Sequence, residues 1–136
     1  MARKKIIPDE VRERAVAIVN QYNEENPVQL KPNPLLKLLK KFGLARPNET
    51  GYRYGDYVPR FRGAFLYLDR VGFDYRLHEI CRLKWTGNFD KWEFAIYKHS
   101  RNYYDPDEWF FPGAETVDGT IVGAMRAGKE AYPDSI

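Results

Sequence analysis

Residues 77–96, LHEICRLKWTGNFDKWEFAI, contain two runs in which apolar and polar residues alternate, joined by a short segment around Gly87. Alternation with a period of two is typical of β-strands that are buried on one side. Pairing the two runs as a hairpin places apolar residues opposite apolar ones and charged opposite charged: Trp85 with Trp92, Leu83 with Phe94, Cys81 with Ile96, and Lys84 with Glu93. This agreement predicts an antiparallel hairpin.

A further alternating run precedes this hairpin and predicts a first strand. Its aromatic positions are Tyr57, Phe61, Phe65 and Tyr67, and its charged positions are Arg60 and Arg62. The connection over residues 69–75 contains Gly72 and is short enough for an antiparallel turn. We therefore expect a three-stranded meander over residues 57–99, with one aromatic face and one charged face.

Helical spacing of apolar residues flanks the strands and predicts helices over residues 8–24 and 118–131. Residues 27–50 are rich in proline and enclose a short basic amphipathic helix over residues 34–42, which we expect to cap the core. Residues 105–111 form an aromatic loop or turn. The predicted fold is α+β: one domain over residues 1–136, in which a three-stranded antiparallel β-meander carries the N-terminal and C-terminal helices on its aromatic face.

The composition is that of a globular protein, because 43% of the 136 residues are hydrophobic, 15% are aromatic and the net charge is only +3. Cys81 is the single cysteine and His78 and His99 are the two histidines, which excludes an internal disulfide and a structural zinc site made of Cys and His. No apolar run approaches the roughly 20 residues of a membrane span. We expect a cytoplasmic protein with no cofactor and no membrane partner.

The charge is distributed unevenly along the chain. Residues 105–136 contain only two of the 22 Lys and Arg residues but seven of the 19 Asp and Glu residues, so the preceding part is basic. Such asymmetry indicates either an anionic partner for the basic part or an acidic segment that packs on it and neutralises it. The sequence leaves both alternatives open.

The charged face of the predicted sheet is the main candidate site. Its cations are suited to phosphates and its rings to stacking on bases, and the candidate residues are Arg60, Arg62, Arg82, Lys84, Tyr97 and His99. This pattern favours a binding module for single-stranded nucleic acid over an enzyme. The alternatives are a solvated or internally paired face, and a protein-interaction module that forms homodimers or docks on a partner through a sheet edge or through residues 35–42.

The segment Arg62 to Tyr67, RGAFLY, resembles the signature of the RNA-recognition-motif family, in which a basic residue and a glycine precede aromatic residues that stack on bases. Ala64 stands where that signature has an aromatic residue. The predicted order of helices and strands also differs from the family's order. No residue role follows from the resemblance.

Three carboxylates lie close together in the aromatic loop, at Asp105, Asp107 and Glu108. They are weak candidates for a divalent cation or for acid and base chemistry, and the simpler interpretation is that they begin a short helical turn. His78, His99 and Cys81 form no recognisable catalytic set with them. We therefore predict no catalytic residues.

Overall fold

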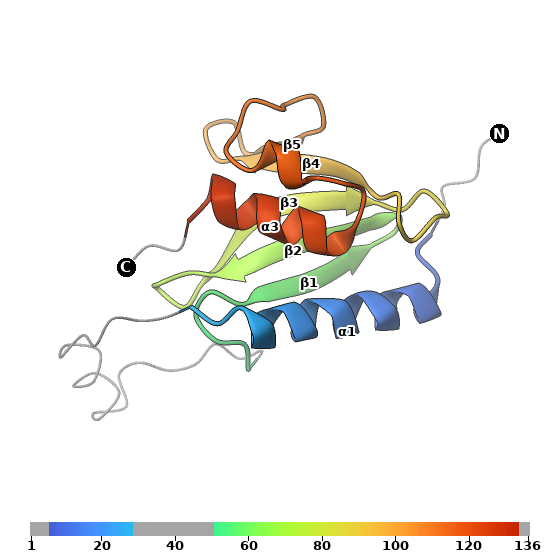
Figure 1. The fold of residues 1–136 in the computed structure, drawn as a ribbon, viewed down its shortest axis with the longest axis horizontal. Coiled ribbons are helices and arrows are strands. Elements are labelled where there is room, and N and C mark those ends of the chain that lie inside the picture. Colours follow the sequence, from blue (N-terminus) through green and yellow to red (C-terminus); the bar gives the residue numbers. More distant parts are fainter. Residues whose placement is uncertain (1–5, 29–50, 134–136) are drawn as a thin grey trace.

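The computed structural model describes residues 6–28 and 51–133. A five-stranded sheet forms its centre, and all strands are antiparallel in the order β1-β2-β3-β4-β5 (Figure 1). The elements in chain order are α1 (Asp9–Glu25), β1 (Tyr57–Arg62), β2 (Phe65–Val71), β3 (Leu77–Lys84), β4 (Glu93–Lys98), β5 (Tyr103–Asp105), the 3-10 turn η1 (Ala114–Thr116) and α3 (Ile121–Ala131). The predicted α+β class with an antiparallel sheet is confirmed, but the sheet has five strands instead of the predicted three.

The first additional strand arises because the predicted first strand is a hairpin. A two-residue turn at Gly63 and Ala64 separates β1 from β2, and Arg62 pairs with Phe65 across it. Gly63 has φ +58°, a conformation that glycine adopts at little cost and that tight hairpin turns require. The alternation of apolar and polar residues continues through this turn, so the sequence pattern does not show where β1 ends and β2 begins.

The second additional strand, β5, lies where a loop was expected. Asn102 has φ +53° in the turn after β4, and this turn returns the chain for three pairs with β4, from Lys98 with Tyr103 to Ile96 with Asp105. The strand ends at Asp105, whose Oδ1 accepts a hydrogen bond from Asp107 N at 2.9 Å. The aromatic loop then begins at Pro106 rather than at Asp105.

The predicted register of the β3–β4 hairpin is confirmed. Cys81 pairs with Ile96, Leu83 with Phe94 and Lys84 with Glu93. The rings of Trp85 and Trp92 lie 4.9 Å apart at the end of the hairpin. Side-chain parity alone was therefore sufficient to fix this pairing.

One hydrophobic core joins both helices to the same face of the sheet. Helix α1 packs against β1 and against α3, while α3 crosses β3 (Figure 1). The buried core side chains include Ala15 and Val19 of α1, Ile121 and Met125 of α3, and Tyr57, Leu66, Leu68, Cys81, Leu83 and Ile96 of the strands. This face is called the helix side below, and the opposite face of the sheet is called the open face.

Helix α3 begins at Ile121, three residues after the predicted start. Gly119 has φ +86°, which no right-handed helix contains, and the Thr120 side chain accepts a hydrogen bond from Gly123 N at 3.0 Å as the helix cap. Helix α1 runs one residue later at each end than predicted. The predicted helix over residues 34–42 lies outside the described residues. Neither described helix is long and apolar enough to span a membrane.

Candidate nucleic-acid interface

Four of the predicted cations lie together on the open face. The strand register forms two rows across β1, β2 and β3: Arg62 pairs with Phe65 and Phe65 with Lys84, while Arg60 pairs with Tyr67 and Tyr67 with Arg82. These positions alternate with the buried core positions Leu66, Leu68 and Leu83, so their side chains project away from the helices. β2 separates the cations of β1 from those of β3, which limits repulsion between them.

Phe65 and Tyr67 lie on the open face and not on the aromatic core face where they were predicted. The turn at Gly63 and Ala64 places Phe65 directly opposite Arg62, and side chains of directly paired residues share one face of a sheet. Both rings are half-buried, and their centroids lie 6.0 Å apart. The candidate interface therefore contains aromatic rings in its central strand, which the sequence interpretation missed.

Two of the arginines lie against these rings. The Arg60 guanidinium is 4.3 Å from the Tyr67 ring centroid, and the Arg82 guanidinium is 4.4 Å from the Phe65 centroid. Tyr104 of β5 reaches over the sheet to within 5.2 Å of Tyr67 and 5.4 Å of the Arg82 guanidinium. At these distances a guanidinium is attracted to a ring by a cation–π interaction. The open face therefore carries arginines and aromatic rings in direct contact.

Carboxylates on the open face offset part of its positive charge. Asp69 lies next to Arg60, with 3.1 Å between its Oδ2 and the Arg60 Nε, and Glu93 pairs across the strands with Lys84. Glu79 pairs across the strands with Asp69. The described strand residues on this side of the sheet therefore include three carboxylates and four cations, which leaves a net charge of about one positive unit.

Tyr97 and His99 are less available to a ligand than the four cations, because other aromatic rings pack against them. Tyr97 is only 8% exposed, and its ring lies between Tyr104 at 4.9 Å and His99 at 4.7 Å. The His99 ring also lies 5.1 Å from Tyr132 beyond the C-terminal end of α3. Stacking of a base on Tyr97 would require these neighbours to move, whereas Phe65 and Tyr67 are partly accessible.

The acidic C-terminal segment does not cover these cations in its described part. Asp105 and Glu108 both bind Lys98, at 3.3 and 2.7 Å, on the helix side of β4. Helix α3 also packs on the helix side (Figure 1). Hydrogen bonds from Asp107 N and from the Tyr103 hydroxyl, and after them the Lys98 ion pair, hold the pKa of Asp105 below its usual range. The hydrogen bond from Lys98, followed by that from Phe110 N, lowers the pKa of Glu108. These carboxylates therefore order the aromatic loop.

The described residues show neither a cluster of side chains suited to a metal ion nor a reactive cysteine. Within residues 6–28 and 51–133, no group of three or more His, Cys, Asp or Glu side chains is arranged to hold a metal ion. Cys81 is fully buried in the core, and burial raises the pKa of its thiol far above the usual range. A thiol in this setting is a poor nucleophile because the thiolate is strongly disfavoured.

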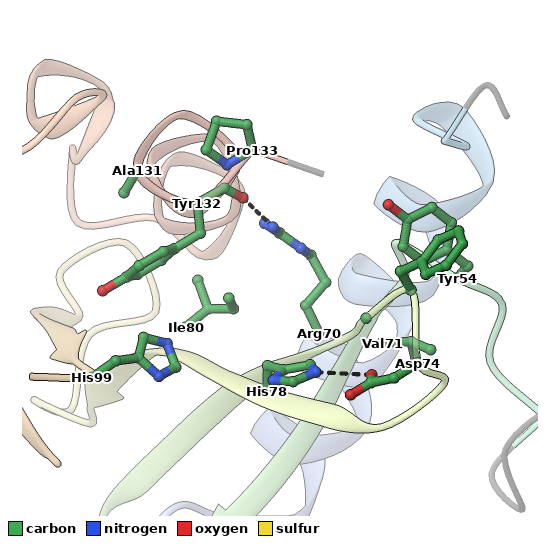
Figure 2. Close-up of a pocket in the computed structure, with 12 residues that line it drawn as sticks. Tyr54, Arg70, Val71, Asp74, His78, Ile80, His99, Ala131, Tyr132 and Pro133 are labelled. Carbon is green, nitrogen blue, oxygen red and sulfur yellow. Dashed lines mark hydrogen bonds and ion pairs between the residues drawn. The ribbon is translucent and has the colours of Figure 1, made fainter. Parts of the chain in front are cut away.

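A pocket of about 490 Å³ lies on the helix side, between the C-terminal end of α3 and the β2–β3 turn (Figure 2). Its walls include Tyr54, Ile80 and Tyr132, and it contains His78 and His99. His78 Nε2 lies 2.9 Å from Asp74 Oδ1. The pocket therefore combines apolar walls with the polar side chains of Arg70, Asp74 and the two histidines.

Arg70 crosses this pocket and has a structural role there. Its buried guanidinium donates a hydrogen bond to the carbonyl oxygen of Tyr132 (Figure 2) and another, of 3.3 Å, to the carbonyl oxygen of Gly128. Arg70 therefore caps the C-terminus of α3. The pairing partner of Arg70 on β3 is His78, which therefore lies on the helix side. Strict alternation along β3 would place His78 on the same face as Arg82, but an irregularity at Ile80 adds one residue between them and moves His78 to the opposite face.

No protein-family model, no curated protein and no solved structure matches this chain, so the open face has to be interpreted from its own geometry.

Proposed function

We propose that this protein binds single-stranded nucleic acid on the open face of its sheet. The observation that carries the proposal is the pair of partly exposed rings, Phe65 and Tyr67, in a central strand between Arg60 and Arg82. Unpaired bases stack on aromatic rings and guanidinium planes, and each stacked base contributes about 1–3 kcal/mol to affinity. Paired bases cannot reach a flat face in this way, so single strands are the expected ligand class.

Phosphate contacts are assigned to the outer cations. Arg62 and Lys84 are exposed and occupy the two ends of the row that has Phe65 at its centre. A strand whose bases stack along β2 would bring its phosphates toward these ends. With two to four such contacts, affinity for a single strand should fall about 7- to 50-fold between 50 and 200 mM salt.

The direct test is fluorescence polarisation with labelled single-stranded RNA, single-stranded DNA of the same sequence and the corresponding duplex, at about 50 and 200 mM salt. We expect both single strands to bind more tightly than the duplex. Arg62→Ala and Lys84→Ala should each lower the magnitude of the salt slope by about 0.7, the value for one phosphate contact on a single strand. Arg126→Ala is the matched control, because Arg126 is exposed on α3 on the other side of the sheet. Absence of binding at the lower salt, or equal binding of duplex, would refute the proposal.

A second candidate function, protein contact, is favoured by the aromatic loop. Phe110 is 99% exposed, and the neighbouring Trp109 and Phe111 stack on each other and lie 6.1 and 5.8 Å from the Phe94 ring. Glu108 Oε1 accepts a hydrogen bond from Phe110 N at 2.8 Å. A rigidly presented aromatic side chain is a typical anchor at protein interfaces.

Self-association through Phe110 is testable without an identified partner. Phe110→Ser should weaken dimerisation about 30-fold if the ring is an interface anchor worth about 2 kcal/mol. It should leave the melting temperature of the monomer unchanged at protein concentrations too low for dimerisation, because the ring makes no core contact. Sedimentation velocity over a range of protein concentrations measures the dimerisation, and equal sedimentation of both proteins would exclude a Phe110 homodimer.

Pairing of a partner strand with the edge strand β1 is a less favourable mode of binding than the open face or Phe110. Pro59 lies within β1 and has no backbone N–H to donate. The Asn23 side chain of α1 already binds the backbone of Tyr57 with two hydrogen bonds, of 2.8 and 2.9 Å. Docking through the helix expected over residues 34–42 stays a prediction, because these residues lie outside the described part of the chain.

A further inference from the structure

Asp69 is a buried acidic residue on the open face, and only one of its two carboxylate oxygens has a hydrogen-bond partner. It is 5% exposed, its Oδ2 accepts the hydrogen bond from Arg60, and its Oδ1 is buried with no hydrogen-bond partner. Burial raises the pKa of this carboxyl group, the Arg60 guanidinium opposes that rise, and the negative charge of Glu79 adds to it. A buried charge with an unsatisfied oxygen costs stability, so packing alone does not explain a carboxylate at this position.

Arg60, the partner of Asp69, is also a member of the proposed interface. Its side chain is 48% exposed, its guanidinium lies on the Tyr67 ring, and its Nε–H points to Asp69. A guanidinium has five N–H donors and binds carboxylates and phosphates with the same geometry. The Asp69 carboxylate therefore occupies part of the donor set that a ligand phosphate would use.

We propose that Asp69 acts as an internal competitor for the ligand phosphate at Arg60 and so sets the affinity of the open face. The inference rests on the proposed nucleic-acid binding. In the free protein, Asp69 neutralises Arg60 through its Nε–H and holds it against Tyr67. In the complex, a backbone phosphate binds the remaining N–H donors of Arg60 and competes with the Asp69 carboxylate for its positive charge.

This exchange also defines the ligand class. An isolated nucleotide offers one phosphate, which must compete with a carboxylate held permanently beside Arg60. A strand that is already held by Arg62, Lys84 and the rings presents its next phosphate to Arg60 at a high effective concentration. The ratio of the affinity for an oligonucleotide to the affinity for a mononucleotide should therefore be much larger than the difference in the number of contacts alone would give.

Asp69→Asn tests the inference, because it keeps the shape of the side chain and removes the competing charge. We expect the affinity for a single-stranded 10-mer at about 50 mM salt to rise about three- to tenfold, the effect of releasing a partly exposed ion pair and removing one negative charge from the face. The magnitude of the salt slope should also rise by about 0.7, because Arg60 becomes an additional free cation before binding.

Glu79→Gln is the matched control, since it removes one negative charge from the same face without touching the Arg60 ion pair. It should raise affinity less than twofold, roughly the effect of a screened surface charge, and leave the slope unchanged. In an Arg60→Ala background, Asp69→Asn should raise affinity no more than Glu79→Gln does, because only the removal of one charge from the face is left; this comparison completes a double-mutant cycle.

The outcomes separate the two proposals. If the wild-type protein binds no single strand, the proposed function fails and this inference fails with it. If the wild-type protein binds and Asp69→Asn raises affinity no more than Glu79→Gln, binding stands and the role of Asp69 is overturned. An Asp69→Asn gain that stays larger than the Glu79→Gln gain when Arg60 is absent would equally overturn it.

Discussion

Replacement of both Phe65 and Tyr67 by alanine is expected to leave only weak binding of single-stranded nucleic acid. Each ring provides a stacking surface for one base, and loss of a stacked base costs about 1–3 kcal/mol, so the double variant should lose at least about 30-fold in affinity. The cations of the face remain, and they sustain only weak, salt-sensitive attraction. Polarisation titrations of the 10-mer at about 50 mM salt measure the loss.

Two control variants identify stacking as the cause of that loss. Phe73→Ala removes an exposed ring from the β2–β3 turn, where it lies beside the pocket of the helix side, and should not change binding. Tyr67→Phe retains the ring and should bind like the wild type. Circular dichroism and thermal melting establish that the double variant is folded at the assay temperature. Wild-type affinity in a folded double variant would show that the rings are not part of the site.

Gly128→Ala is expected to destabilise the protein, although alanine normally stabilises a helix relative to glycine by up to about 1 kcal/mol. A Cβ at this position would overlap the Tyr57 hydroxyl oxygen and would lie 2.6 Å from Ile80 Cγ2. Tyr57 is fully buried, and its hydroxyl donates a hydrogen bond to Met125 O at 2.7 Å, so the ring cannot move aside cheaply. Overpacking of this kind costs about 1–3 kcal/mol, which corresponds to a fall in Tm of roughly 3–12 °C.

Chemical denaturation measures this change in the free energy of unfolding. Arg126→Ala, at an exposed position of the same helix, should change stability by less than about 0.5 kcal/mol. Tyr57→Phe removes the overlapping oxygen, so the combination with Gly128→Ala should be less destabilising than the sum of the single variants. A stabilised Gly128→Ala variant would mean that α3 does not approach the sheet this closely.

The sequence by itself determined the α+β class, both described helices and the register of the β3–β4 hairpin. These features follow from local periodicity: a strand alternates its side chains strictly, so Cys81, Leu83 and Trp85 could match Ile96, Phe94 and Trp92 in only one parity. The four cations of the candidate interface were also grouped correctly, because Arg60 and Arg62 share one parity in β1, and Arg82 and Lys84 share one parity in β3.

Only the tertiary structure decided which side chains accompany those cations. The tight turn at Gly63 reverses the chain without breaking the apolar and polar alternation, and it moves Phe65 and Tyr67 to the open face. The extra residue at Ile80 reverses the parity within β3, and it moves His78 to the helix side. Both are backbone irregularities of one or two residues, and their position depends on pairing with a neighbouring strand, which no local pattern contains.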